Sequence, residues 1–316
     1  MSYSSPLPAE FLQRLTAIVP PSWYEQVFAT FHQHRTCSFR VNTLRSSTAD
    51  ALAELSALDI SASPVPWCAE AFVVPHGQRS LLSTSAAFSE GRIYIQNLSS
   101  MAPVLLLNPR PGEQVLDLAA APGGKTLHLA ALMENRGWIS AVEAVKDRFF
   151  RLKANVEAFG ASIVHTYLRD GRTVGLACPE HFDRVLLDAP CSSEARFHAD
   201  NPASWQFWSP AKIREAARKQ KPLLFSAWQS LKPGGTMVYC TCSFAPEENE
   251  AMVAALLKKY GDAVDILPLE LPFANTIPGL THWLGKEFDP RLERTRRILP
   301  DAFMDSFYLA HLRKVP

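Results

Sequence analysis

The sequence is short of cysteine, of net charge and of long hydrophobic runs. Six cysteines in 316 residues are too few for a disulfide scaffold, so we expect reduced thiols. Lysine plus arginine number 32 and aspartate plus glutamate 31, a formal net charge of +1, which excludes a protein that binds polyanions through its charge as a whole. The most apolar stretches, such as 101–107 and 252–257, are far shorter than the ~18 residues that a membrane span needs.

The first ten residues also lack the basic stretch and apolar core of a signal peptide. We therefore expect a cytoplasmic protein that does not bind a membrane. An apolar share of 47% with 20% charged residues predicts a folded chain, and 316 residues suffice for two domains.

The residue pattern changes along the chain, and this change predicts where the two domains divide. Residues 1–95 predict a small α/β domain, with helical spacing at 7–19, 23–31 and 49–58 and strand-like alternation at 39–43. Residues 96–316 alternate short apolar runs with longer helical stretches, which is typical of βαβ units. We expect a helix at 210–231, ended by the glycines of 232–235, and strands at 114–118, 138–142, 162–166, 184–188, 237–240, 263–267 and 306–312. The fold class is therefore α/β, with a mostly parallel, seven-stranded, Rossmann-like sheet.

A small-residue loop follows the first of these strands. It consists of Ala119, Ala120, Ala121, Pro122, Gly123, Gly124 and Lys125. Small residues let a ligand approach the backbone, and a helix N-terminus attracts an anionic group. One candidate ligand is a nucleoside triphosphate, because 124–126 resembles the end of a P-loop, although Ala119 stands where that loop needs glycine. An ordinary strand-to-helix turn is the plain alternative.

The other candidate ligand is a cofactor that contains adenosine. In a Rossmann-like sheet, an acid about 20 residues past the glycines, at the end of the second strand, binds the ribose hydroxyls. Glu143 lies 20 residues after Gly123 and directly follows the strand at 138–142. Asp170 follows the third strand and is placed to meet the adenine amino group, although Asp170-Gly171 is also a common turn.

Cysteines stand at the ends of two predicted strands. Cys191 follows the fourth strand through Asp188-Ala189-Pro190, and Cys242 follows the fifth. Because the carboxyl ends of neighbouring parallel strands meet at one crevice, we expect both thiols to lie beside Asp188 and the 122–125 loop. Cys240 is expected to point into the sheet, by alternation with Cys242. No Cys or His pair matches this Cys-Thr-Cys segment, so we expect no metal.

Two thiols and a carboxylate suit methyl transfer to C5 of a pyrimidine. That carbon becomes nucleophilic when a thiolate adds to C6 and an acid supports N3, and the thiol leaves after a base removes the C5 proton. Lys125 could supply the positive charge that a thiolate needs. Chemistry alone leaves open which thiol is the nucleophile.

At these residues the sequence closely resembles the Nop/Sun family of S-adenosylmethionine-dependent RNA cytosine-5 methyltransferases. The resemblance covers most of the chain, and the combination of the proline-cysteine and threonine-cysteine motifs is its most specific part. The motifs are RVNTLR at 40–45, YIQN at 94–97, SSM at 99–101, AAPGGKT at 120–126, DAPCS at 188–192, TCS at 241–243, PEENE at 246–250 and LAHLRK at 309–314.

The resemblance implies a class I methyltransferase fold with S-adenosylmethionine as cofactor. It implies that Cys242 is the nucleophile, that Cys191 releases the product and that Asp188 holds the cytosine N3 edge. Lys125 is the fourth predicted catalytic residue, because of the positive charge that it could supply to a thiolate. The cofactor contacts that the resemblance implies are Ala119, Ala120, Ala121, Pro122, Gly123, Gly124, Lys125, Glu143, Arg148, Asp170 and Asp188.

The loop after Cys191 departs from the family pattern. The family usually has Cys-Ser-Gly-Glu-Gly followed by an Arg-Lys pair, whereas this chain has Ser193, Ala195 and a single Arg196. We expect a stiffer loop, and a phosphate contact that is lost or moved to Arg196.

We predict an RNA cytosine-C5 methyltransferase with an RNA-binding front domain, acting on ribosomal RNA in preference to transfer RNA. A non-catalytic RNA-binding assembly factor and a P-loop ATPase are the alternatives, and no oligomeric state is predicted. The candidates for RNA contact, each of which could equally lie on a solvated face, are Arg35, Arg40, Arg45, Arg291, Arg294, Arg296 and Arg297.

Overall fold

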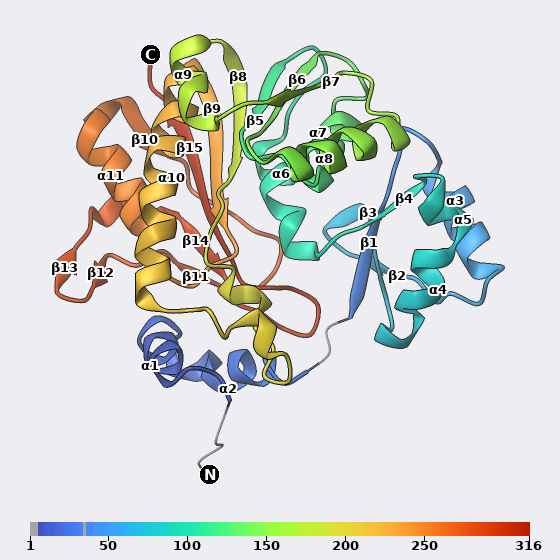
Figure 1. Cartoon of the computed structure of the whole chain (residues 1–316), viewed down its shortest axis with the longest axis horizontal. Helices are drawn as coiled ribbons and strands as arrows, with labels where there is room; N and C mark the ends of the chain where they lie inside the picture. Colours follow the sequence, from blue (N-terminus) through green and yellow to red (C-terminus); the bar gives the residue numbers. More distant parts are fainter. Residues whose placement is uncertain (1–5, 34–35) are drawn as a thin grey trace.

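The computed structural model describes residues 6–33 and 36–316. Within these residues, nine strands form one sheet in the larger domain, in the order β11-β14-β15-β9-β8-β5-β6-β7, with β10 paired to β15 (Figure 1). The parallel part consists of β5 (Gln114–Asp117), β6 (Trp138–Glu143), β7 (Val164–Leu168), β8 (Phe182–Asp188) and β9 (Leu231–Thr241). The antiparallel part adds β10 (Val264–Ile266), β11 (Thr276–Pro278), β14 (Arg296–Ile298) and β15 (Phe307–Lys314).

All seven predicted strands are present, and the α/β fold class is confirmed. The strands β11 and β14 extend the sheet beyond the prediction. Each has three residues, and β14 carries two arginines, so neither shows the apolar alternation by which a strand is recognised. A separate short hairpin joins β12 (His282–Trp283) to β13 (Lys286–Glu287).

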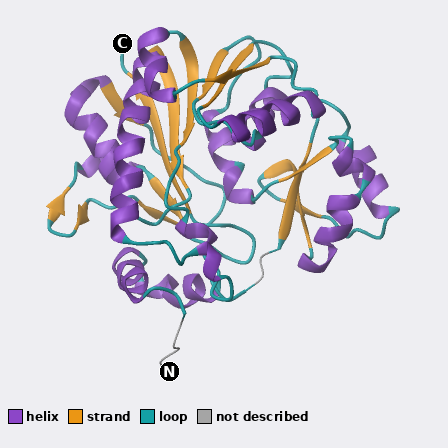
Figure 2. Cartoon of the chain, viewed as in Figure 1, coloured by secondary structure: helices purple, strands orange, loops and turns teal. Residues whose placement is uncertain are grey.

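Side chains alternate between two cores along the strands. Leu186 and Val238 face a core with α6 (Ala102–Leu107), α7 (Gly124–Leu132) and α8 (Lys146–Ala158). Leu187 and Tyr239 face the opposite core, with α9 (Val174–Ala177), α10 (Pro210–Ser230) and α11 (Glu250–Tyr260). Figure 2 shows helices on both faces of the sheet. Burial on both faces explains the continuous apolar runs in the sequence.

The front domain has its own sheet and its own core. Its described strands have the order β2-β3-β1-β4 and are β1 (Cys37–Val41), β2 (Ser63–Val65), β3 (Cys68–Val74) and β4 (Ile93–Ile95). The helices α3 (Thr48–Ser56), α4 (Arg79–Thr84) and α5 (Ala86–Ser89) cover this sheet and bury Leu55 and Leu82 against it.

The first two helices pack on the larger domain instead. Side chains of α1 (Ala9–Ile18) and α2 (Pro21–Ala29) share a core with Phe197, Phe244 and Trp283. Figure 1 shows both helices beside the lower end of α10, away from β1 to β4. The chain therefore runs from the larger domain into the front sheet and back.

The helix expected at 210–231 ends slightly before the glycines that were expected to stop it. It ends at Ser230, because Leu231 is already extended and pairs with Phe182 in the sheet. The segment 232–235 lies in the irregular start of β9, where the register to β8 shifts. In the described ranges, no helix is long and apolar enough to cross a membrane.

Candidate active site

The carboxyl ends of β5, β8 and β9 open onto a cleft of about 760 Å³, a size typical of small-molecule sites. The cleft also reaches residues 94–97 of the front domain, which arrive there through β4. The predicted site residues that line it are Ala119, Ala120, Ala121, Pro122, Gly124, Lys125, Arg148, Asp188, Cys191 and Cys242.

The two thiols lie next to each other. Cys191 Sγ and Cys242 Sγ are 3.3 Å apart, although the residues are separated by 51 positions in the chain. A hydrogen bond from the Cys191 thiol lowers the pKa of Cys242, burial opposes this, and the charge of Arg196 lowers the pKa further. The same contact, together with burial, raises the pKa of Cys191 well above its ordinary value. Cys242 is therefore the thiol that ionises first.

A charged pair lies beside the thiols. Lys125 Nζ donates to Asp188 Oδ2 at 2.6 Å and to Ser100 Oγ at 3.0 Å. Burial lowers the pKa of Lys125, but the charge of Asp188, its hydrogen bond and the nearby Cys240 and Cys242 together raise it above its ordinary value. The ammonium group thus holds the Asp188 carboxylate in place at the end of β8.

Ser193 adopts a backbone conformation that favours glycine. Its φ of 58° lies in the left-handed region, which costs a residue with a side chain roughly 1–2 kcal/mol. This explains why glycine is usual at this position in the family that the motifs resemble. The Ser193 hydroxyl group lies 4.0 Å from Cys191 Sγ and also lowers the pKa of Cys242.

Two buried carboxylates join the two cysteine loops. Glu194 follows Cys191, and its Oε2 accepts from Phe244 N at 2.8 Å and from Ala245 N at 3.0 Å in the loop of Cys242. In the opposite direction, Glu248 Oε2 accepts from Ser192 N at 2.9 Å. Burial raises the pKa of both, to about 7 for Glu248. Neither residue was assigned a role from the sequence, although Glu194 lies three residues after Cys191 and Glu248 six residues after Cys242.

The 119–125 loop leaves space for a ligand. A Cβ atom on Gly124 would lie 2.8 Å from the ring of Tyr94. The space between the loop and this ring therefore admits only glycine at position 124. Arg148 Nη2 donates to the carbonyl of Ala121 at 2.6 Å and fixes the loop.

Glu143 is buried at the end of β6. Its Oε1 accepts from Val145 N, while its Oε2 accepts no hydrogen bond from any described residue and lies 3.5 Å from Arg148 Nη2 as an ion pair. A carboxylate oxygen without a hydrogen-bond donor fits the ribose hydroxyls of S-adenosylmethionine, which donate. Gly123, Glu143 and Asp170 do not themselves line the cleft, and the Asp170 carboxylate is held by Arg172 Nε at 2.9 Å.

Two expectations about single residues are wrong. Cys240 and Cys242 were expected to alternate, but Cys240 Sγ lies 3.8 Å from Asp188 Oδ1, beneath the cleft, because residues two apart on a strand share a face. Arg40 and Arg297 were candidates for RNA contact, but they are only 1% and 3% exposed.

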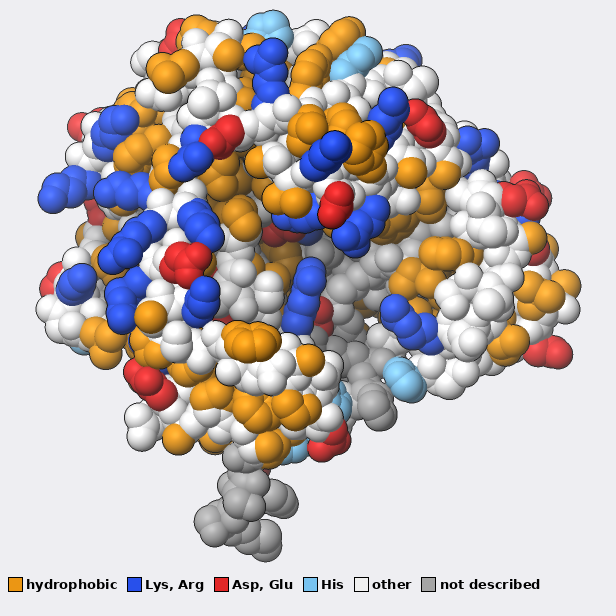
Figure 3. Space-filling model, viewed as in Figure 1, with side chains coloured by type: hydrophobic (Ala, Val, Ile, Leu, Met, Phe, Trp, Pro, Cys, Tyr) orange, Lys and Arg blue, Asp and Glu red, His pale blue; other side chains and the backbone are white. Residues whose placement is uncertain are grey.

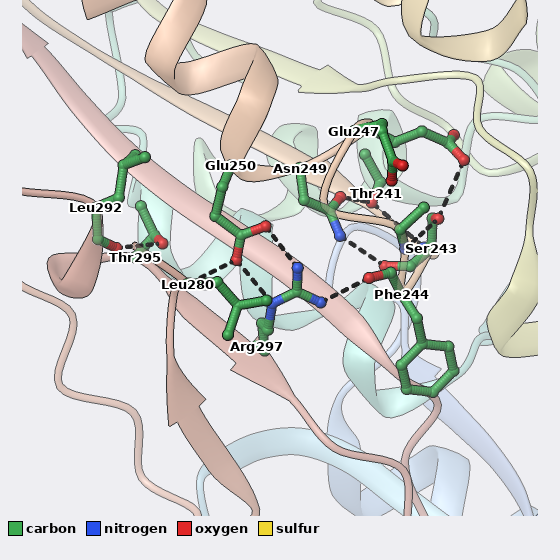
Figure 4. A network of polar contacts seen from close by, with 12 residues as sticks. Thr241, Ser243, Phe244, Glu247, Asn249, Glu250, Leu280, Leu292, Thr295 and Arg297 are labelled. Atoms are coloured by element: carbon green, nitrogen blue, oxygen red, sulfur yellow. Dashed lines mark hydrogen bonds and ion pairs between the residues drawn. The ribbon is translucent and has the colours of Figure 1, made fainter. Parts of the chain in front are cut away.

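The buried arginines have partners inside the protein. Arg297 Nε donates to Glu250 Oε1 at 2.7 Å, and its Nη1 donates to the carbonyl of Phe244 at 2.8 Å (Figure 4). Burial lowers the pKa of Arg40 to about 10. The remaining candidates for RNA contact differ in exposure and in their partners. Arg45 is exposed, whereas Arg291 and Arg294 pair with aspartates and Arg296 donates to backbone carbonyls. Arg35 lies outside the described residues.

A family model described as 16S rRNA methyltransferase RsmB/F matches residues 104–313. The chain belongs to this family. A second model, the N-terminal domain of 16S rRNA methyltransferase RsmF, matches residues 7–98. Membership of RsmB/F confirms the resemblance, the methyltransferase class and S-adenosylmethionine as the cofactor of the family, and it overturns the P-loop alternative.

Curated relatives of this RsmB/F chain are named ribosomal RNA small subunit methyltransferase F. The protein from Serratia proteamaculans is 39% identical over 313 residues, and that from Klebsiella pneumoniae is 40% identical over 314. The matches cover 98% and 97% of this chain, which spans 63% of the length of each relative.

Solved structures share the fold over nearly the whole chain. A methyltransferase homolog protein from Pyrococcus horikoshii is 32% identical, with a TM-score of 0.79 over 98% of this chain and 100% of its own. The structure of NSun6 from the same organism with SFG is 21% identical, with a TM-score of 0.83 over 99% of this chain and 100% of its own, and shows a shared fold.

Proposed function

We propose that this RsmB/F chain methylates C5 of a cytosine in RNA, with ribosomal RNA as the preferred substrate and the cytoplasm as its location. The observation that carries the proposal is the thiol pair of Cys191 and Cys242, 3.3 Å apart, in one cleft with the 119–125 loop and the Lys125–Asp188 pair. When bound, S-adenosylmethionine supplies an electrophilic methyl group. The loop residues 119–125 would hold it, with Glu143 as the acceptor for its ribose hydroxyls.

The pKa directions of the two thiols support the roles that the resemblance implies. Cys242 ionises first, so its thiolate forms the bond to C6 while the C5–C6 π electrons move to C5. Asp188, held by Lys125, binds the cytosine at its N3 edge during this addition. C5 then takes the methyl group, which the cofactor sulfonium would release with the electrons of the broken carbon–sulfur bond staying on sulfur. A base removes the C5 proton, and the returning electron pair expels Cys242 as a thiolate. Cys191 stays protonated beside Cys242 and is the thiol needed for this release.

The proposal predicts a covalent intermediate that only one cysteine variant accumulates. Wild type, Cys191→Ala, Cys242→Ala and the double variant are incubated with 16S ribosomal RNA and S-adenosylmethionine and run on a denaturing gel. We expect a protein–RNA adduct in Cys191→Ala and none in Cys242→Ala or the double variant, with repeated turnover abolished in all three. Cys178→Ala is the matched control, because Cys178 is a free thiol that does not line the cleft, and it should behave as wild type.

Two other results would contradict the proposal. An adduct in Cys242→Ala alone would reverse the roles of the thiols. Bound cofactor with no adduct and no methyl transfer in any variant would instead favour the non-catalytic RNA-binding factor.

A further inference from the structure

The positive charge of the chain is concentrated on one helix. Although the whole sequence has a formal net charge of +1, α10 has one acid, Glu215, and five cations, which are Lys212, Arg214, Arg218, Lys219 and Lys221. All five cations are exposed, while Ile213, Gln220 and Leu224 turn the opposite face of the helix into the core. Figure 3 shows lysine and arginine side chains gathered over α10, left of the centre of the view.

Three of the five cations have no ionic partner. Lys212 and Lys219 pair with Glu215 at 2.9 and 2.7 Å. Within the described part of the chain, no carboxylate pairs with Arg214, Arg218 or Lys221. An exposed row of unpaired cations repels itself unless it meets an anion, so this face is suited to a polyanion.

A groove connects this helix to the active-site cleft. It has a volume of about 300 Å³ and lies between the segment 197–208 and the side of α10 that has Lys212, Glu215 and Lys219. Arg214, Arg218 and Lys221 do not line it and lie on the other exposed side of the helix. Pro190 and Cys191 line both the groove and the cleft, so the groove lies next to the thiol proposed for product release.

An exposed aromatic ring stands in the wall of the groove. Phe207 is 77% exposed and precedes α10. Its neighbours hold the loop in place, since Trp208 Nε1 donates to Glu194 Oε1 at 2.8 Å and Trp205 Nε1 donates to the carbonyl of His198 at 3.1 Å. The ring of Phe207 is therefore presented to solvent by an anchored loop.

We propose that the α10 groove, defined as the exposed face of α10 and the hollow beside Phe207, binds the single-stranded RNA next to the target cytosine. The Phe207 ring stacks on an unpaired base in the hollow, and Arg214, Arg218 and Lys221 pair with phosphates where the strand continues over the exposed side of α10 outside the hollow. Cations along a backbone path together with an aromatic platform are the general means of binding single strands, and a paired base could not reach the ring. This inference rests on the proposed function and replaces Arg40 and Arg297 as the source of RNA affinity.

The test measures RNA binding as a function of salt. The dissociation constant of a labelled single-stranded RNA, containing cytosine and adenine only, is determined by fluorescence anisotropy at several potassium chloride concentrations. For Arg214→Gln/Arg218→Gln/Lys221→Gln, we expect weaker binding and a slope of log affinity against log salt that is lower by about 2, since each lost contact with a single strand removes about 0.7. For Phe207→Ala, we expect about tenfold weaker binding with an unchanged slope, because stacking releases no counterions.

The matched control removes the same charge from another surface. Arg110→Gln/Arg136→Gln/Arg313→Gln changes three exposed arginines at the opposite end of the sheet and should keep the wild-type slope. Binding of S-adenosylmethionine, measured by calorimetry, should be unchanged in every variant and reports on folding. If the α10 variant keeps the affinity and slope of wild type, or if the control loses as much, this inference is overturned while the proposed function stands. A wild-type chain that transfers methyl groups to no RNA and binds none would overturn both.

Discussion

At the scale of single residues, the chemistry depends on which sulfur carries one negative charge. Two thiols 3.3 Å apart do not both ionise at neutral pH, because the second charge would lie against the first. Arg196 and Ser193 stabilise a thiolate on Cys242, whereas Glu248 opposes one on Cys191. Arg196, in the altered loop after Cys191, is therefore suited to activating the Cys242 thiol as the nucleophile.

Replacing Arg196 should move the pH dependence of the reaction. The pKa of Cys242 is lowered to about 7, so its thiolate is present above that pH and is lost as the pH falls through it. Arg196→Gln removes a positive charge, which should raise this pKa and shift the rising limb of the activity profile to higher pH by about one unit. The rate at which iodoacetamide alkylates Cys242, read by peptide mapping across pH, measures the pKa directly. Arg196→Lys keeps the charge and should leave the profile in place; an equal shift in both variants would contradict this explanation.

At the scale of elements, the parallel strands were predictable and the loops between them were not. Strands buried on both faces have continuous apolar runs, and their carboxyl ends must meet, so Cys191, Cys242 and the 119–125 loop could be placed together from the sequence. The hydrogen bonds that Phe244 N and Ala245 N donate to Glu194 could not be predicted, because they join loops about fifty residues apart through backbone groups that have no sequence signature.

Glu194 should act as a positioning residue that couples the ends of β8 and β9. Its Oε2 also accepts from Ser243 Oγ at 3.0 Å, and its Oε1 accepts from Trp208, so every partner of this carboxylate is a donor. Glu194→Gln places an amide N–H group against these donors, which should cost ~2 kcal/mol and lower kcat while the affinity for S-adenosylmethionine stays unchanged. Urea unfolding, single-turnover methyl transfer and calorimetry measure the three quantities. The exposed Glu134→Gln serves as control, and wild-type kcat in Glu194→Gln would show that the loop bonds do not position Cys242.

At the scale of the whole molecule, β1 to β4 form a sheet of their own, but the sequence cannot show that α1 and α2, which lie within the predicted 1–95 domain, pack on the larger domain. Their apolar spacing predicts helices and says nothing about which core receives them. The same reason explains why the burial of Arg40 and Arg297 was not predicted. A basic residue in a sequence suggests a surface position, and its burial is revealed only by a distant partner, such as Glu250, 47 residues from Arg297.

The packing of α1 gives the N-terminal helices a part in the reaction. Phe11 is buried, and its ring lies 5.0 Å from that of Phe197, which follows the Cys191 loop, and 6.3 Å from that of Phe244, which follows Cys242. The Phe11 side chain of α1 therefore packs against a residue next to each of the two cysteine loops. Truncating it removes this support from both loops, and displacement of a reacting group by about 1 Å can cost ~10²-fold in rate.

Phe11→Ala should therefore lower the rate of methyl transfer by more than its loss of stability explains. The cavity should cost ~3–4 kcal/mol in the free energy of unfolding. Leu55→Ala is the matched control, because Leu55 is equally buried but lies in the core of the front sheet and should cost a similar amount. At a temperature where both variants remain folded by circular dichroism, we expect Phe11→Ala to lose at least about tenfold in single-turnover rate and Leu55→Ala to keep the wild-type rate. Equal rates in the two variants would mean that α1 and α2 stabilise the larger domain without positioning the thiols.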